Sequence, residues 1–487
     1  MTLNLKKEKG LIVTLLIVLS MGIIAMPAEE CPGDAMSVRV ETVNLLENGT
    51  FGVSVEIATK YWGDKGMFFD LNEKTGKWYP KYGIMNTLIY VPVLAVEKLV
   101  NGKIHQLSTP LRLILLNFHN IILSLLCAAS FYFLARLFTT YSLIAAAFTL
   151  TVIYTTFCWY YFRAQIFEIH TVLFLSWATY LFIRCYRSSC MNEVHKIKES
   201  QVTFFLGGSL VGLLMLSKTV YVVIAALALV GWVLIPSLRK NLFTKKAVFY
   251  FAPIFLAAVI ILMCNEWRFG SPFNTGYNQW AAESRPMSGD IFRGVTGYLF
   301  DTQWGIFSCF PILLFSLLYW RKFFRCYTVE STVILAIGLV LLLINSCFIN
   351  WRGLWSYGPR YLLPILPALS LPAIYLLEGV ISISSKPIKS SCILALVIAA
   401  IFAASLQEVV NRLPFYTWYQ LEGKLSHRDS RQLGMYMYAT PFWQINKDLI
   451  YYQSGKESPL LSLLAPNDYR DAREYIQKLS NNYYWFK

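Results

Sequence analysis

The sequence predicts an all-α protein, a multi-pass bundle of helices that cross a membrane. Of its 487 residues, 56% are hydrophobic and only 15% are charged, whereas a soluble domain carries roughly a quarter charged residues. Apolar runs of about 17 to 25 residues recur between Leu11 and Leu406, and each is long enough to cross a hydrocarbon core of roughly 30 Å as a helix. Loops and open sheet edges are excluded from lipid by their unmet backbone hydrogen bonds. We therefore predict a transmembrane helical bundle.

The first apolar run extends from Leu11 to Met26 and follows a segment rich in lysine. This layout is also that of a secretory signal peptide, for which cleavage after Ala25 or Ala28 is the alternative. We expect a retained first helix, because the later spans already commit the chain to the membrane and the run is long for a signal core.

The charge of the loops predicts the orientation of the bundle. With a cytoplasmic amino terminus, the clusters of Lys and Arg fall on alternate short loops, as the positive-inside rule requires. Orientation also explains the formal charge of +15 better than a nucleic-acid partner does, since the basic residues are scattered. About eleven crossings follow from this pattern, at residues 11–27, 111–134, 138–157, 167–183, 202–217, 219–236, 247–264, 305–320, 329–347, 361–379 and 391–406.

One further apolar run, residues 84–100, is expected to lie at the outer surface of the membrane. Counting it as a crossing would reverse every later loop. We therefore divide the chain into a transmembrane domain, residues 1–406, with a long extracytoplasmic loop at 28–110, and an extracytoplasmic tail, residues 407–487, that caps the bundle. The expected location is the plasma (inner) membrane.

The cysteines give no sign of a metal site. Most of the ten lie in or beside apolar spans, and no CxxC or His-flanked spacing is present. We expect no metal and no cofactor.

The first outer loop carries a carboxylate just beyond the first span. Asp34 precedes an amphipathic stretch that ends at Asn48-Gly49, so it is expected near the membrane surface, where a general base can work. The alternative is that Asp34 caps a helix beginning near Ala35 or Ser37, which is the commoner role of aspartate.

An aromatic and basic segment, KWYPKYG, leads into residues 84–100 and contains Lys81 and Tyr82. Lys81 is a candidate phosphate ligand, acting as a point charge, while Tyr82 is expected at headgroup depth. Snorkelling of Lys81 to anionic lipid is the alternative.

Arg360 lies directly before the tenth predicted span and three residues after Tyr357. A cation at the mouth of an apolar helix is costly unless it pairs with a phosphate or a carboxylate. The sequence leaves a phosphate contact and a structural pairing with Asp34 or Glu41 both open, and we count Tyr357 as a candidate substrate contact.

Four weaker candidates lie in two short outer turns. Arg163, Glu168 and His170 come between the third and fourth spans, and Lys218 comes between the fifth and sixth. Each is equally consistent with a solvated turn residue.

Five segments of these loops share the pattern of a known group of enzymes. They are GDAMSVRVETVNLLENGTF, KWYPKYGIMNTLIYVP, FGSPFNTGY, QWGIFSCFPILLF and WRGLWSYGPRYLLPILPAL. In this order they resemble the GT-C type glycosyltransferases of bacteria and archaea, akin to protein O-mannosyltransferases and the lipid A aminoarabinose transferase. The resemblance covers most of residues 10–380, and the last segment is the most specific.

The resemblance implies a polyprenyl-phosphate-linked sugar donor, which the protein binds from the outer leaflet of the lipid membrane. It also implies an acceptor that enters from the extracytoplasmic side. It also implies that Asp34 is the general base, that Lys81 contacts the donor phosphate and that Arg360 neutralises it. The acidic pair familiar in such enzymes is reduced here to Gly33-Asp34-Ala35. A second carboxylate is therefore expected from Glu41 or from another loop.

The main alternative is a transporter or flippase of a lipid-linked glycan. Such a protein would carry ionisable residues near the bilayer midplane and helices broken in symmetric halves. The sequence has no internal repeat, and its charges gather at the outer mouth. A catalytically inactive relative that serves in assembly is a third reading.

Overall fold

The computed structural model describes residues 8–27, 30, 34–61, 68–104, 109–190, 201–277, 287–301, 304–353 and 358–383. The predicted span at 391–406, the tail at 407–487 and Tyr357 lie outside the described residues.

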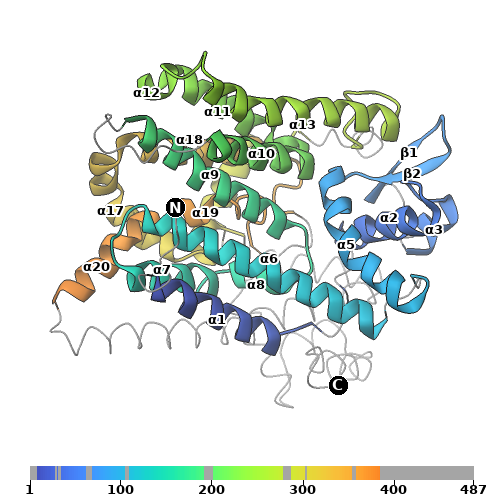
Figure 1. The fold of residues 1–487 in the computed structure, drawn as a ribbon, viewed down its shortest axis with the longest axis horizontal. Helices are drawn as coiled ribbons and strands as arrows, with labels where there is room; N and C mark the ends of the chain where they lie inside the picture. Colours follow the sequence, from blue (N-terminus) through green and yellow to red (C-terminus); the bar gives the residue numbers. More distant parts are fainter. Residues whose placement is uncertain are drawn as a thin grey trace.

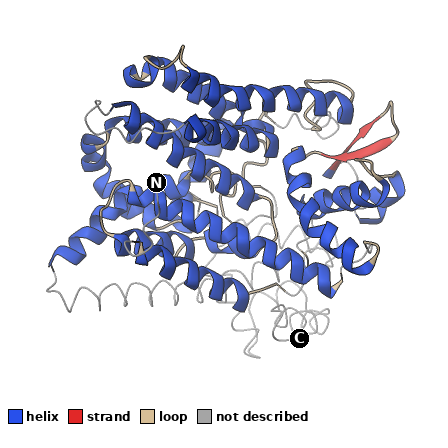
Figure 2. Ribbon diagram, viewed as in Figure 1, coloured by secondary structure: helices blue, strands red, loops and turns tan. Residues whose placement is uncertain are grey.

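The described chain is a bundle of helices with one small hairpin (Figure 2). At least one helix overlaps each of the first ten predicted spans, and the longer helices run side by side in Figure 1. These are α1 (Lys9–Ile24), α6 (Pro110–Arg136), α7 (Ser142–Tyr154), α9 (Glu168–Cys190), α10 (Gln201–Ser217), α11 (Val222–Leu234), α13 (Lys245–Phe269), α17 (Ile312–Cys326) and α18 (Thr328–Ser346).

The outside of the bundle is suited to lipid. Phe255 on α13 is 72% exposed and Leu318 on α17 is 75% exposed, and exposed apolar surface of this extent marks a membrane or a partner. By length and composition, four described helices can cross a membrane: α5 (Ile84–Asn101), α6, α13 and α18. The protein is therefore an integral membrane protein, while the count of eleven crossings stays a prediction.

Two predicted spans are not continuous helices. Residues 305–320 divide into α16 (Ile306–Cys309) and α17 at Pro311, and residues 361–379 divide into α19 (Leu366–Leu369), η3 (Leu371–Ala373) and α20 (Ile374–Ile383). Proline removes a backbone donor and clashes with the preceding turn. Pro364, Pro367 and Pro372 explain the second interruption. Short helices also occur at α8 (Cys158–Arg163), η2 (Thr219–Tyr221) and α12 (Pro236–Arg239).

One end of the bundle carries the first outer loop, at the right of Figure 1. It consists of α2 (Asp34–Asn48), α3 (Val55–Tyr61), the antiparallel strands β1 (Phe69–Asn72) and β2 (Lys77–Pro80), and α5. The hairpin was not part of the all-α prediction. The side chain of Asn72 donates to the carbonyl of Trp267 at 3.0 Å and so ties the hairpin to the end of α13. A separate helix, α15 (Ile291–Phe300), packs beside α18.

The opposite end of the bundle is fastened by ion pairs between helices. Arg136 at the end of α6 pairs with Glu8 at 3.1 Å, and Arg187 of α9 pairs with Glu330 of α18 at 2.8 Å. These arginines belong to loops that the charge pattern places in the cytoplasm. Ion pairs therefore join helices at this end of the bundle, while the other end carries the elements of the first outer loop.

The length of α13 gives a direct test of orientation. Phe243, 98% exposed, lies two residues before α13 begins, and Glu73 lies in the hairpin turn next to the end of the same helix. Single cysteines at these positions, in a background without the native cysteines, are expected to react with a membrane-impermeant maleimide from opposite sides of intact membranes. Labelling of both from one side would contradict a membrane-spanning α13.

Candidate active site

The central contact of the site is an ion pair between Asp34 and Arg360. Nη1 of Arg360 lies 2.9 Å from Oδ2 of Asp34 and 3.2 Å from Oε1 of Glu168. Asp34 begins α2, Glu168 begins α9, and Arg360 precedes α19. The fold thus brings together two predicted site residues and one of the weaker candidates from three distant parts of the chain.

Asp34 does not act as a helix cap. It is itself the first residue of α2, and its two carboxylate oxygens accept from the hydroxyl of Tyr82, at 2.5 Å, and from Arg360. Among the described residues, no backbone N–H donates to this carboxylate. The capping alternative is therefore not what the structure shows, whereas the pairing of Arg360 with Asp34 that the sequence left open is present.

Tyr82 is a permanent donor in this arrangement. Burial raises the pKa of its phenol well above the ordinary value, and the neighbouring Asp34 carboxylate raises it further. The hydroxyl therefore keeps its proton at neutral pH and holds one oxygen of Asp34 in a fixed direction. Tyr82 therefore orients the candidate base.

Arg360 is positioned by the glycine two residues before it. Gly358 has a left-handed φ of 64°, and a Cβ there would lie 2.6 Å from the ring of Phe157. The Arg360 amide donates to the carbonyl of Gly358 at 2.9 Å, which closes a tight turn. Only glycine fits both the conformation and the close approach, so the turn fixes where the guanidinium enters the site.

A cavity of about 50 Å³ lies around the ion pair and has room for a few water molecules. Its charged lining consists of Asp34, Lys81, Glu168, Lys218 and Arg360. Lys81 is 6% exposed. The remaining lining side chains are aromatic, namely Phe68, Tyr82, Phe167, Tyr277, Phe348 and Tyr361. Three cations therefore face two carboxylates. The buried position of Lys81 argues against snorkelling to lipid, and the excess of cations favours an anion.

A further carboxylate, that of Asp70, lies within reach of the charge of Lys81. Burial raises the pKa of Asp70, on β1, and the positive charge of Lys81 opposes that rise. The ammonium of Lys81 also lies 5.7 Å from the centre of the Tyr277 ring. The sequence did not single out Asp70 or Tyr277, and the hairpin that places Asp70 was not predicted.

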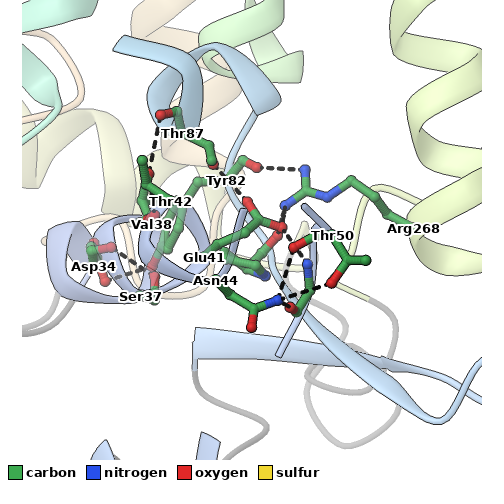
Figure 3. A network of polar contacts seen from close by, with 12 residues as sticks. Asp34, Ser37, Val38, Glu41, Thr42, Asn44, Thr50, Tyr82, Thr87 and Arg268 are labelled. Atoms are coloured by element: carbon green, nitrogen blue, oxygen red, sulfur yellow. Dashed lines mark hydrogen bonds and ion pairs between the residues drawn. The ribbon is translucent and has the colours of Figure 1, made fainter. Parts of the chain in front are cut away.

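Glu41 lies on α2 with Asp34 but faces a different group of residues. Figure 3 shows it turned toward Thr87 and Arg268, and it is fully buried. The hydroxyl of Thr87 donates to Oε2 of Glu41 at 2.6 Å, and Nη2 of Arg268 lies 3.5 Å from Oε1. Arg268 also donates to the carbonyls of Pro80 and Tyr82, at 2.6 and 2.9 Å. Glu41 and Arg268 therefore join α2, the hairpin, α5 and α13.

Arg163 is a predicted site residue that lies outside the cavity. Nε of Arg163 donates to the carbonyl of Ala25, next to the end of α1, and Arg163 does not line the cavity. It contacts the end of α1 through this bond. Tyr357 is outside the described residues.

A metal has no evident place in the described part of the chain. No group of three or more His, Cys, Asp or Glu side chains is arranged there to hold an ion. Metal independence stays a prediction.

No protein-family model matches the sequence, and no curated protein matches it either. Solved structures do match. The lipid A aminoarabinose transferase ArnT of Cupriavidus metallidurans, bound to undecaprenyl phosphate, superposes with a TM-score of 0.53 and 12% identity over 98% of this chain and 75% of its own. The chain has the GT-C fold.

A second solved structure supports this fold. The oligosaccharyltransferase AglB of Archaeoglobus fulgidus, in complex with an inhibitory peptide and a dolichol-phosphate, gives a TM-score of 0.54 and 12% identity over 92% of this chain. The match covers 60% of AglB, so the chain spans about three fifths of that protein's length. At such low identity, both comparisons show the GT-C fold rather than a shared activity.

The buried contact between Glu41 and Arg268 predicts a large effect on stability. Arg268→Gln leaves Glu41 without its cation, and a buried charge left without its partner costs about 3 to 5 kcal/mol. The thermal unfolding temperature of the purified protein in detergent is expected to fall clearly. Lys74→Gln is the matched control, because the pair of Lys74 with Glu266 is 73% and 53% exposed and such pairs contribute about 0 to 1 kcal/mol. Equal stability of the two variants would contradict a structural role for Arg268.

Proposed function

We propose that the protein is an integral membrane glycosyltransferase that moves a sugar from a polyprenyl-phosphate donor to an extracytoplasmic acceptor. This proposal depends on one observation: the carboxylate of Asp34 is paired with Arg360 in a cavity that Lys81 and Lys218 also line. A base beside a group of cations suits a reaction in which a hydroxyl loses a proton and a phosphate leaves. The GT-C fold supports the same assignment.

Asp34 is the proposed general base. The acceptor oxygen attacks the anomeric carbon, its proton passes to the Asp34 carboxylate, and the bond between that carbon and the phosphate oxygen breaks with its electron pair on the phosphate. One displacement of this kind inverts the anomeric centre, as with an opposed base and leaving group. Tyr82 fixes the direction of the carboxylate before the acceptor arrives.

Lys81 and Arg360 are the proposed ligands of the donor phosphate. The phosphodiester of the donor carries one negative charge, and the monoester that leaves carries about −1.5 to −2 at neutral pH. Cations already in place stabilise this growing charge without reorganisation. Because Arg360 pairs with Asp34, protonation of Asp34 by the acceptor also frees Arg360 to bind the departing phosphate more strongly.

Glu168 is the proposed second carboxylate of the site. It shares Arg360 with Asp34, so Arg360 keeps one anionic partner when Asp34 is neutralised. Glu41, which the sequence suggested for this place, is tied to Arg268 and Thr87. We propose that Glu41 supports catalysis by holding the first outer loop on the bundle.

The Asp34→Asn variant tests the proposed base. Asparagine keeps the shape of the side chain but cannot accept the proton, so the rate of sugar transfer is expected to fall at least roughly a hundredfold. The measurement is release of polyprenyl phosphate from a radiolabelled polyprenyl-phosphate sugar in proteoliposomes that contain native membrane acceptors.

Asp290→Asn is the matched control for this experiment. Asp290 is a true helix cap, which accepts from the amides of Phe292 and Arg293 at the start of α15, and asparagine caps about as well as aspartate. Its activity is expected to be that of the wild type. Full activity of Asp34→Asn would remove Asp34 from the chemistry. Translocation of the intact lipid-linked sugar without its cleavage would favour a transporter.

A further inference from the structure

Lys218 is held beside the active site by contacts of the backbone around it. The carbonyls at the end of α10 lie against the start of α5, where a Cβ on Gly83 would be 2.0 Å from the oxygen of Leu216. The side-chain amide of Asn86 donates to the carbonyl of Ser217 at 2.8 Å. The turn that carries Lys218 is therefore fixed against the same loop that carries Lys81 and Tyr82.

Lys218 lines the cavity, and its ammonium forms no ion pair with a described residue. It is 4.0 Å from the centre of the Tyr361 ring, a favourable cation–π contact. Within the described residues, no hydrogen bond or ion pair to the ammonium is formed. Asp34 and Glu168 are near enough to act on its charge, but both are paired with Arg360.

Of the other two cations of the cavity, Arg360 is paired directly with Asp34 and Glu168, and Lys81 lies within reach of the charge of Asp70. An incoming phosphate must compete with two paired carboxylates for Arg360, whereas Asp34 and Glu168 act on Lys218 only through their charge, with no ion pair to its ammonium among the described residues. Nε of Arg360 is a second donor there without a hydrogen-bond partner, so a phosphate bound by Lys218 has a further N–H to accept from on the same cavity wall.

We propose that Lys218 is a ligand of the donor phosphate, the cation that binds it before the reaction while Arg360 is still paired with Asp34. This inference rests on the proposed function. Lys218, together with Lys81, binds the incoming phosphodiester, and Arg360 joins them when the acceptor proton neutralises Asp34. The product monoester then lies beside all three cations, which offsets the negative charge that it gains.

The proposed role of Lys218 predicts that donor binding depends on pH. Burial, and then the positive charge of Arg360, lower the pKa of its ammonium to about 8, against the raising effect of Glu168 and Asp34. Lys81 and Tyr361 also face the cavity. Lys218 is therefore charged below about pH 8 and loses its charge above it, so affinity for the donor is expected to fall as the pH rises through this value.

The test compares Lys218→Gln, Lys218→Arg and Lys322→Gln with the wild type. Lys322, on α17, is the matched control. Its ammonium lies 4.3 Å from the centre of the Tyr375 ring, and Lys322 does not line the cavity. Two quantities are measured in proteoliposomes from pH 6.5 to 9.5: kcat/KM for a polyprenyl-phosphate sugar, and binding of polyprenyl phosphate alone by quenching of tryptophan fluorescence.

The expected result is a loss of about ten- to hundredfold in kcat/KM and in polyprenyl phosphate binding for Lys218→Gln, as for a lost contact with a charged group. The fall above pH 8 is expected to disappear in Lys218→Gln and to move to higher pH in Lys218→Arg, because arginine stays charged. Lys322→Gln is expected to match the wild type in both quantities.

Unchanged affinity and an unchanged pH profile in Lys218→Gln would overturn the proposal while leaving the glycosyltransferase assignment in place. Absence of transfer by the wild type, with normal binding of polyprenyl phosphate that depends on Lys218, would overturn the proposed function instead. If Lys218→Gln is unstable in thermal unfolding, the pH profile of Lys218→Arg decides alone.

Discussion

The ion pair between Asp34 and Arg360 joins residues 326 positions apart, and the rest of the site is arranged around it. A charged pair at the mouth of a membrane bundle is stabilised by further contacts to its remaining donors and acceptors. Tyr82 satisfies one oxygen of Asp34, and Glu168 gives Arg360 a second anion. The left-handed turn at Gly358 directs the guanidinium to this place. The same contact that stabilises the resting protein therefore holds the candidate base beside the candidate phosphate ligand.

The first outer loop is fastened to the bundle by contacts separate from this ion pair. α2 carries Asp34 at its first residue and Glu41 two turns further along, so the start of the helix lies at the cavity while its middle is fastened to α13 and the hairpin. A displacement of α2 would separate Asp34 from Arg360 and from Tyr82 together. The cavity around the pair measures about 50 Å³, against roughly 300 to 1,000 Å³ for usual ligand pockets.

Much of the fold could be predicted from the sequence, because hydrophobic length determines which segments become helices in a membrane. The pairing of distant residues could be predicted only as a set of alternatives: local sequence allowed Arg360 to meet Asp34, Glu41 or a phosphate. Asp34 was ambiguous because aspartate both caps helices and accepts protons, and only its tertiary partners separate the two roles. The hairpin at residues 69–80 was missed because its pattern is short and lies between helical segments. Lys218 stayed a weak candidate, since its place depends on the packing of α10 against Gly83.

The most direct test of this account is a cryo-EM structure of the protein with a bound polyprenyl phosphate in lipid nanodiscs. The central claim is that the cations around Asp34 form the phosphate site of the donor. We predict phosphate oxygens within hydrogen-bond distance of Arg360, Lys81 and Lys218, with the carboxylate of Asp34 facing the space left for the sugar and the acceptor. Density for the phosphate at another place, with the pair of Asp34 and Arg360 unchanged, would contradict the account.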